Sequence, residues 1–206
     1  MTYYENERRE LAPMLPNLRG KRVLELGCGG GRMSRWLKND MGAAYIFGVE
    51  LDPEAGAEAR QFLDEVHIAD LDTFELPDDA QFDVVICADV IEHLKDPWAV
   101  IQRVLSHVVQ GGYLVTSTPN IRNWRIIKDL VVGGDFPYEA YGLRDRTHLR
   151  WFTQKTIVGF HREVGMRVDE VGYVPLSGRT AQLDRATQGR LRDFLIGQHV
   201  VRSQKP

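Results

Sequence analysis

Short apolar runs alternate with other segments along the first half of this chain. Each run is rich in valine, isoleucine, leucine or phenylalanine, and each is followed by glycine, proline or an acidic residue. Runs of this length and composition are typical of strands that are buried on both faces of a sheet. We therefore expect five parallel strands, at residues 23–26, 44–49, 66–69, 82–88 and 113–118.

The segments between these runs carry the signals of helices. Met33, Trp36 and Leu37 recur at helical spacing after the first run. The Asp-Pro pairs at 52–53 and 96–97 have the pattern of a capping residue followed by proline in the first turn. Strands that alternate with helices form parallel sheets covered on both faces. The pattern predicts an α/β fold with a doubly wound, mostly parallel sheet.

Both ends of the chain add further elements. Residues 3–15, within an N-terminal segment of residues 1–18, have the spacing of a short amphipathic helix closed by Pro16. Near the other end we expect a helix, a strand, a second helix and a final strand, at residues 153–164, 166–174, 182–195 and 196–203.

Residues 119–152 form an insertion without a clear period. It contains six basic and four acidic residues together with several aromatic ones. A connection this long in a compact domain is often a lid over a site, although a helix and loop packed on the sheet edge fit the pattern equally well. As a lid, its net positive charge would suit a polar, somewhat anionic acceptor.

Composition narrows the class of protein. With 206 residues, 43% of them hydrophobic, the chain is long enough for one domain that spans residues 1–206. A net charge of −3 does not favour nucleic acid as a partner. The two cysteines have neither disulfide nor zinc spacing, and no apolar run approaches the ~20 residues of a membrane span. The charged N-terminus lacks the apolar core of a signal peptide, so we expect a cytoplasmic protein.

The turn after the first strand carries the most specific pattern. A dinucleotide-binding turn needs G-x-G-x-x-G, and Arg32 occupies the sixth position when counted from Gly27. An NAD-dependent oxidoreductase is therefore disfavoured. The pattern found here is E-x-G-x-G-x-G, at Glu25, Gly27, Gly29 and Gly31. It resembles the cofactor loop of class I S-adenosylmethionine-dependent methyltransferases.

The resemblance implies S-adenosylmethionine as cofactor, S-adenosylhomocysteine as its product, and a seven-stranded sheet whose last strand is antiparallel. Glu50 ends the second strand beside the glycine turn, where a carboxylate can accept both ribose hydroxyls of an adenosine. In methyltransferases of this type an acid at the position of Asp70 bonds the adenine amino group, with Leu71 near the ring. The full set of implied cofactor-binding residues is Tyr4, Glu25, Gly27, Cys28, Gly29, Gly31, Glu50, Leu51, Asp70, Leu71, Ala88 and Asp89.

Two histidines are the predicted catalytic residues. Residues 82–94 closely resemble the fourth motif of these methyltransferases, and His93 lies within them, just past the fourth strand. His148 lies near the end of the insertion. A base helps to remove the proton of a hydroxyl acceptor, and histidine is the usual base near neutral pH. For each histidine, the alternative is a structural role.

The same segment carries a possible metal-binding pattern. Asp89, Glu92 and His93 would share one face if the segment is helical, because Glu92 and His93 follow Asp89 by three and four residues. Ubiquinone-biosynthesis O-methyltransferases carry two carboxylates and a histidine at matching positions, where they can hold magnesium. Asp89 is shorter than the glutamate usual in that group. We therefore predict no metal, and expect Glu92 and His93 to orient the turn and line the acceptor pocket.

The sequence thus predicts a methyltransferase that acts on an oxygen of a small molecule or a sugar, by in-line methyl transfer aided by a histidine base. A regulatory protein that binds a partner enzyme is the alternative. Pro119-Asn120 and Trp124-Arg125 resemble a segment of methionine-biosynthesis proteins of the MetW type. The patterns leave the identity of the acceptor and the formation of a homodimer open.

Overall fold

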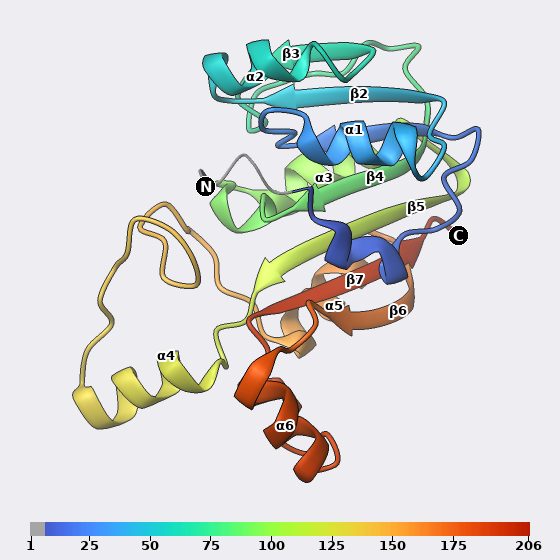
Figure 1. The fold of residues 1–206 in the computed structure, drawn as a ribbon. Helices are drawn as coiled ribbons and strands as arrows, with labels where there is room; N and C mark the ends of the chain where they lie inside the picture. The colour runs from blue at the N-terminus through green and yellow to red at the C-terminus, as the bar shows by residue number, and fades with distance from the viewer. Residues whose placement is uncertain (1–6) are drawn as a thin grey trace.

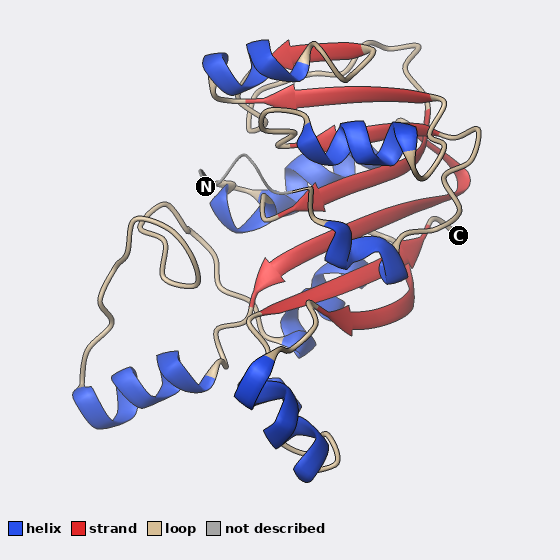
Figure 2. Ribbon diagram, in the orientation of Figure 1, coloured by secondary structure: helices blue, strands red, loops and turns tan. Residues whose placement is uncertain are grey.

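The computed structural model describes residues 7–206, which form one seven-stranded sheet with helices on both faces (Figures 1 and 2). The strand order is β3-β2-β1-β4-β5-β7-β6. The first five strands are parallel, and β7 runs antiparallel to both β5 and β6, as expected for the last strand. The strands are β1 Arg22–Leu26, β2 Tyr45–Glu50, β3 Glu65–Ile68, β4 Phe82–Ala88, β5 Val108–Pro119, β6 Arg167–Tyr173 and β7 Gln198–Gln204.

Three helices begin at capping residues that the sequence predicts. Asp52 accepts hydrogen bonds from two backbone N–H groups at the start of α2, and Asp96 and Thr153 each accept one at the starts of α3 and α5. The helical segments are η2 Arg9–Met14, α1 Arg32–Asn39, α2 Pro53–Ala59, η3 Ile91–His93, α3 Pro97–Leu105, α4 Trp124–Lys128, η4 Asp129–Gly133, α5 Gln154–Glu163, α6 Gly178–Ala186 and α7 Arg192–Leu195.

Two apolar cores lie on the two faces of the sheet. Successive side chains of a strand point to opposite faces, and β1 follows this rule: Val23 packs in the core with η2 and α1. The next residue, Leu24, points to the other face, where it packs with Leu26, α3 and α5. Both cysteines are buried and free, as expected. Because both faces are covered, ligands can reach the sheet only at its ends.

Two of the predicted helices were wrong in extent. Within residues 7–15, the expected helix is reduced to the 3-10 turn η2, because Pro13 has no N–H to continue an α-helix. The remainder of that prediction, including Tyr4, lies outside the described residues. The expected helix over 182–195 is split into α6 and α7 by Gln188 and Gly189, whose positive φ angles break the helical path.

The insertion leaves the sheet and returns to it at one point. Asn120 and Phe152 pair as an isolated bridge, and the Ile121 N–H donates to the Phe152 carbonyl at 3.0 Å. Between these points α4 and η4 project from the body, and the loop that follows arches back toward it (Figure 1). Arg144 ties this loop together by pairing with both Asp129 and Glu139.

No helix among residues 7–206 is long and apolar enough to cross a membrane.

Candidate cofactor and acceptor site

The turn between β1 and α1 needs its glycines. Gly27, Gly29 and Gly31 have φ angles of 68°, 52° and 76°, in the left-handed region that side chains disfavour. A Cβ on Gly27 would stand 2.6 Å from Cγ2 of Val90, in the segment after β4. Gly27 therefore lets the turn pack closely against the segment after β4.

Glu50 lies at the carboxyl end of β2 and faces this turn. Its Oε2 accepts a hydrogen bond from the Gly29 N–H at 2.7 Å. Its Oε1 accepts from the N–H groups of Leu51 and Asp52, both at 2.9 Å. These three donors hold the carboxylate at the sheet edge.

Glu25 and Cys28 turn inward instead. The Glu25 carboxylate is buried and accepts a hydrogen bond from the Ser34 hydroxyl on α1. Burial raises the pKa of Glu25 to about 7, and the negative charge of Glu50 adds to the effect. Cys28 is buried too, with its sulfur packed against Gly48. Because the Cys28 side chain is part of the core, only its backbone can contact a ligand.

The other predicted cofactor residues follow the ends of β2, β3 and β4. Asp70 caps a tight turn, since its Oδ1 accepts from the Asp72 N–H at 2.9 Å. Leu51 is 67% exposed, which is high for a large apolar side chain beside two buried strands. Leu71 and Ala88 are partly buried at the same edge. The glycine turn, the two acidic residues and the exposed leucine fit an adenosine cofactor.

Asp89 is held by a network that spans three strands and the N-terminal segment. It adopts a φ of 58°, unusual for a residue with a side chain. Its carboxylate accepts hydrogen bonds from Arg8, from the Ser117 hydroxyl at 3.0 Å and from the Gln198 amide at 2.8 Å. Arg8 also donates to Ser117 and Gln198. The network closes the sheet edge between β4, β5 and β7.

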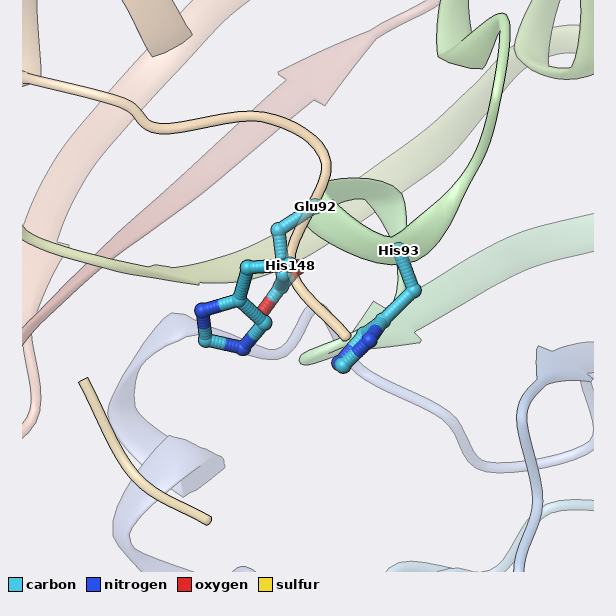
Figure 3. A group of neighbouring side chains, drawn as sticks. All are labelled: Glu92, His93 and His148. Atoms are coloured by element: carbon cyan, nitrogen blue, oxygen red, sulfur yellow. The ribbon is translucent and has the colours of Figure 1, made fainter. Parts of the chain in front are cut away.

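Glu92, His93 and His148 form a second cluster, shown in Figure 3. The first two come from η3, and His148 comes from the loop of the insertion. The Glu92 carbonyl accepts from the N–H groups of Leu149 and Arg150, at 2.8 and 3.0 Å, which docks the loop onto η3. The two imidazoles meet edge to face, with ring centroids 4.7 Å apart.

The electrostatics of this cluster are unusual. Glu92 is 1% exposed, and neither carboxylate oxygen has a hydrogen-bond partner among the described residues. Burial, followed by the negative charge of Asp89, raises the pKa of Glu92 well above its usual range. His148 is 6% exposed and its Nδ1 has no partner within residues 7–206. Burial and the neighbouring His93 lower the pKa of His148, which favours the neutral base.

One atom each of Glu92, His93 and His148 lies within 4.8 Å of the others, so this donor set could hold a divalent ion. Asp89 is not part of the set. The expectation that Asp89, Glu92 and His93 share a helix face was wrong, because η3 is a single turn that begins after Asp89. Arg8 holds the Asp89 carboxylate instead.

A cavity of about 360 Å³ opens beside the cluster. Asp89, Glu92, Asp145 and His148 contribute its polar lining, and the 174–177 segment after β6 contributes apolar and hydroxyl groups. His93 does not line it. None of the six basic residues of the insertion lines it either.

Sequence reasoning missed two residues of this edge. Arg8 precedes η2, and Asp145 precedes His148 by three residues. The Thr147 N–H and hydroxyl donate to Asp145 at 2.8 and 2.7 Å, which shapes the turn that presents His148. The motif Asp-x-Thr-His is a signal of this turn. No local signal pairs Arg8 with Asp89, because they are 81 residues apart.

Comparison with known proteins gives a consistent result. Residues 3–171 match the family model described as a methyltransferase domain. The chain is 28% identical over 169 residues to the ubiquinone biosynthesis O-methyltransferase of Aromatoleum aromaticum, with 78% of this chain and 71% of that protein covered. The same enzyme of Aeromonas salmonicida is 28% identical over 171 residues, with 78% and 70% covered.

Solved structures share the fold. A S-adenosylmethionine-dependent methyltransferase from Mesorhizobium loti superposes with a TM-score of 0.67 at 22% identity, covering 96% of this chain and 97% of that one. A second such methyltransferase, from Archaeoglobus fulgidus, gives a TM-score of 0.66 at 19% identity, covering 97% and 92%.

Proposed function

This chain belongs to the methyltransferase domain family and uses S-adenosylmethionine, and from that premise we propose that it methylates an oxygen atom of a small molecule with a histidine as base. The observation that carries the proposal is the cavity beside His148, which opens where the cofactor edge of the sheet ends. The relatives named O-methyltransferase support oxygen as the acceptor atom.

S-adenosylmethionine supplies, when bound, an activated methyl group on a positively charged sulfur. Glu50 and Asp70 hold the adenosine, and the turn with Gly27, Gly29 and Gly31 gives the cofactor close access to the backbone. The acceptor occupies the neighbouring cavity. Holding the two reactants in line removes much of the entropic barrier of a bimolecular step.

His148 removes the proton of the acceptor hydroxyl. It lines the cavity, its Nδ1 is unpartnered among the described residues, and its lowered pKa keeps it neutral and able to accept a proton. With the acceptor in the cavity, the imidazole of His148 would take up the proton that the hydroxyl loses when it is methylated. His93 is the second candidate, but its Nδ1 shares a hydrogen bond with the Thr147 hydroxyl at 3.0 Å.

The insertion acts as a lid through its 142–148 loop. Gly142, Leu143, Asp145 and His148 all line the cavity, so movement of this loop would open or close the acceptor site and move the base with it. The projecting α4 contributes no residue to the cavity lining.

The test is a methyl-transfer assay with isotopically labelled S-adenosylmethionine and a panel of hydroxylated small molecules and sugars, with the labelled atom located by NMR. His148→Ala should lower kcat by about 10²- to 10⁴-fold, the usual contribution of a general base, and should leave cofactor affinity unchanged. His93→Ala should have a smaller effect.

His107→Ala is the matched control. His107 lies before β5, at the opposite end of the sheet, where its Nδ1 contacts the Ala80 carbonyl at 3.0 Å. Its replacement should not change kcat. A label found on nitrogen, or full activity of His148→Ala, would refute the proposed chemistry.

A further inference from the structure

The acceptor cavity has an unbalanced charge. Three carboxylates, Asp89, Glu92 and Asp145, line it. No lysine or arginine of residues 7–206 does so. The net positive charge of the insertion predicted an anionic acceptor, but none of its six basic residues lines the cavity. Arg144 pairs with acidic groups of the insertion itself, and Arg122 pairs with Asp193.

The three carboxylates differ in how far they are compensated. Asp89 has the guanidinium of Arg8 and two further donors. Asp145 has two hydrogen bonds from Thr147. Glu92 has no partner in the described chain, although it is almost completely buried. A buried carboxyl without a partner costs free energy, so its presence calls for a group that completes it.

The lining of the cavity also has an apolar part. Leu143 from the insertion and the Val174, Pro175 and Leu176 side chains after β6 contribute it. A ligand that suits this lining has a hydrocarbon body together with polar groups.

We infer that the acceptor carries a protonated amine in addition to the hydroxyl that is methylated, and that Glu92 binds this amine. The substrate class is therefore a small hydroxylated amine with an apolar body. This inference rests on the proposed function, since it assigns the acceptor of the same site. A protonated amine favours the ionised form of Glu92 and forms an ion pair with it, whereas a phosphate or carboxylate meets no lysine or arginine in the lining.

The experiment measures binding rather than turnover. Three probes share a cyclohexanol ring and carry at the opposite carbon an amino group, a second hydroxyl or a carboxylate. Their dissociation constants are measured by ligand-observed NMR on the full chain with S-adenosylhomocysteine present. The amine should bind at least about tenfold more tightly than the carboxylate, with the diol between them.

Glu92→Gln keeps the size of the side chain but cannot ionise when the amine binds. In this variant the amine and the carboxylate should bind within about threefold of each other. Glu75→Gln is the matched control, because Glu75 is an exposed carboxylate that does not line the cavity. It should keep the wild-type preference. Circular dichroism establishes that both variants are folded.

Three results would overturn the inference: a carboxylate that binds as tightly as the amine, a preference that survives in Glu92→Gln, or no binding of the amine at the highest soluble concentration. The outcome is separable from the proposed function. A methyl group found on nitrogen refutes O-methylation but leaves a charge preference intact.

Discussion

Two buried carboxylates at the same edge of the sheet have opposite surroundings. Glu50 is 7% exposed and accepts three backbone hydrogen bonds, from Gly29, Leu51 and Asp52. Glu92 is 1% exposed and accepts none from the described chain. The carboxylate of Glu50 is held by its own turn, whereas that of Glu92 has no such support. In the proposed site, the cofactor half of the edge is therefore built in advance, and the acceptor half is completed by its substrate.

The two halves also differ in how they are assembled. The cofactor half consists of single turns that follow β1, β2 and β3. The acceptor half brings together the segment after β4, the 142–148 loop, the 174–180 segment and the start of β7. Gly27 and Val90 are the point where the halves touch.

The largest expected effect is at this contact. Gly27→Ala should lower the free energy of unfolding by about 2–5 kcal/mol, because the residue has a left-handed φ and its new Cβ would overlap Val90. Urea unfolding measures the effect. It should also weaken cofactor binding, since the turn must shift.

A double mutant separates the two causes. Val90→Ala removes the overlap but not the backbone strain, so Gly27→Ala in that background should cost about 1–3 kcal/mol less than in the wild type. If the two changes are simply additive, the halves are not coupled through this contact.

The next largest effect is on how the free energy of unfolding depends on pH. Glu25 in the cofactor half and His199 on β7 should change it in opposite directions. The raised pKa of Glu25, about 7 against a usual 4.5, means that its stabilising effect is complete below pH 4.5 and is lost as the pH rises through 7. Burial lowers the pKa of His199 on β7 to about 4, against a usual 6.5, so its effect is present above pH 6.5 and is lost as the pH falls through 4.

Each of these two pKa shifts corresponds to a contribution on the order of 3 kcal/mol to the free energy of unfolding. Relative to wild type, Glu25→Gln should therefore gain stability between pH 5 and 8, and His199→Phe should gain stability as the pH falls from 7 to 4. Chemical unfolding at a series of pH values measures both. Parallel pH profiles for the wild type and either variant would contradict the assignment of that group.

Glu50→Ala tests the cofactor half alone. Removing hydrogen bonds to a charged group costs about 1.5–3 kcal/mol, so the affinity for S-adenosylmethionine should fall about tenfold or more. Calorimetric titration measures it. Asp78→Ala, an exposed acid in the loop before β4, is the control. The charge preference of the acceptor cavity should be unchanged in Glu50→Ala, and a changed preference would show that the halves are not independent.

The smallest expected effect concerns the loop of the insertion. Arg144→Ala removes the pairs with Asp129 and Glu139. Ion pairs near the surface contribute little, so stability should fall by less than about 1 kcal/mol. The acceptor KM should rise a few fold because the 142–148 loop loses a tether, with cofactor affinity unchanged. An unchanged KM would mean that docking of the loop onto η3 holds it without Arg144.

The predictions that succeeded rest on contiguous residues. The strands near 23–26, 44–49 and 82–88 and the caps at Asp52 and Asp96 follow from apolar runs and capping chemistry that act within a few residues. The helices that failed show where such rules end. Pro13 and the pair Gln188-Gly189 interrupt patterns whose apolar spacing alone favoured a helix.

The sequence by itself determined the doubly wound sheet, the glycine turn and the family, because each depends on the order and spacing of neighbouring residues. Only the tertiary structure decided the acceptor site. It paired Arg8 with Asp89, brought His148 from the insertion to Glu92, and left the basic residues of the insertion out of the cavity lining. Charge counted along a segment does not say which way its side chains face. The fold sets their direction, and with it the sign of the charge that a substrate meets.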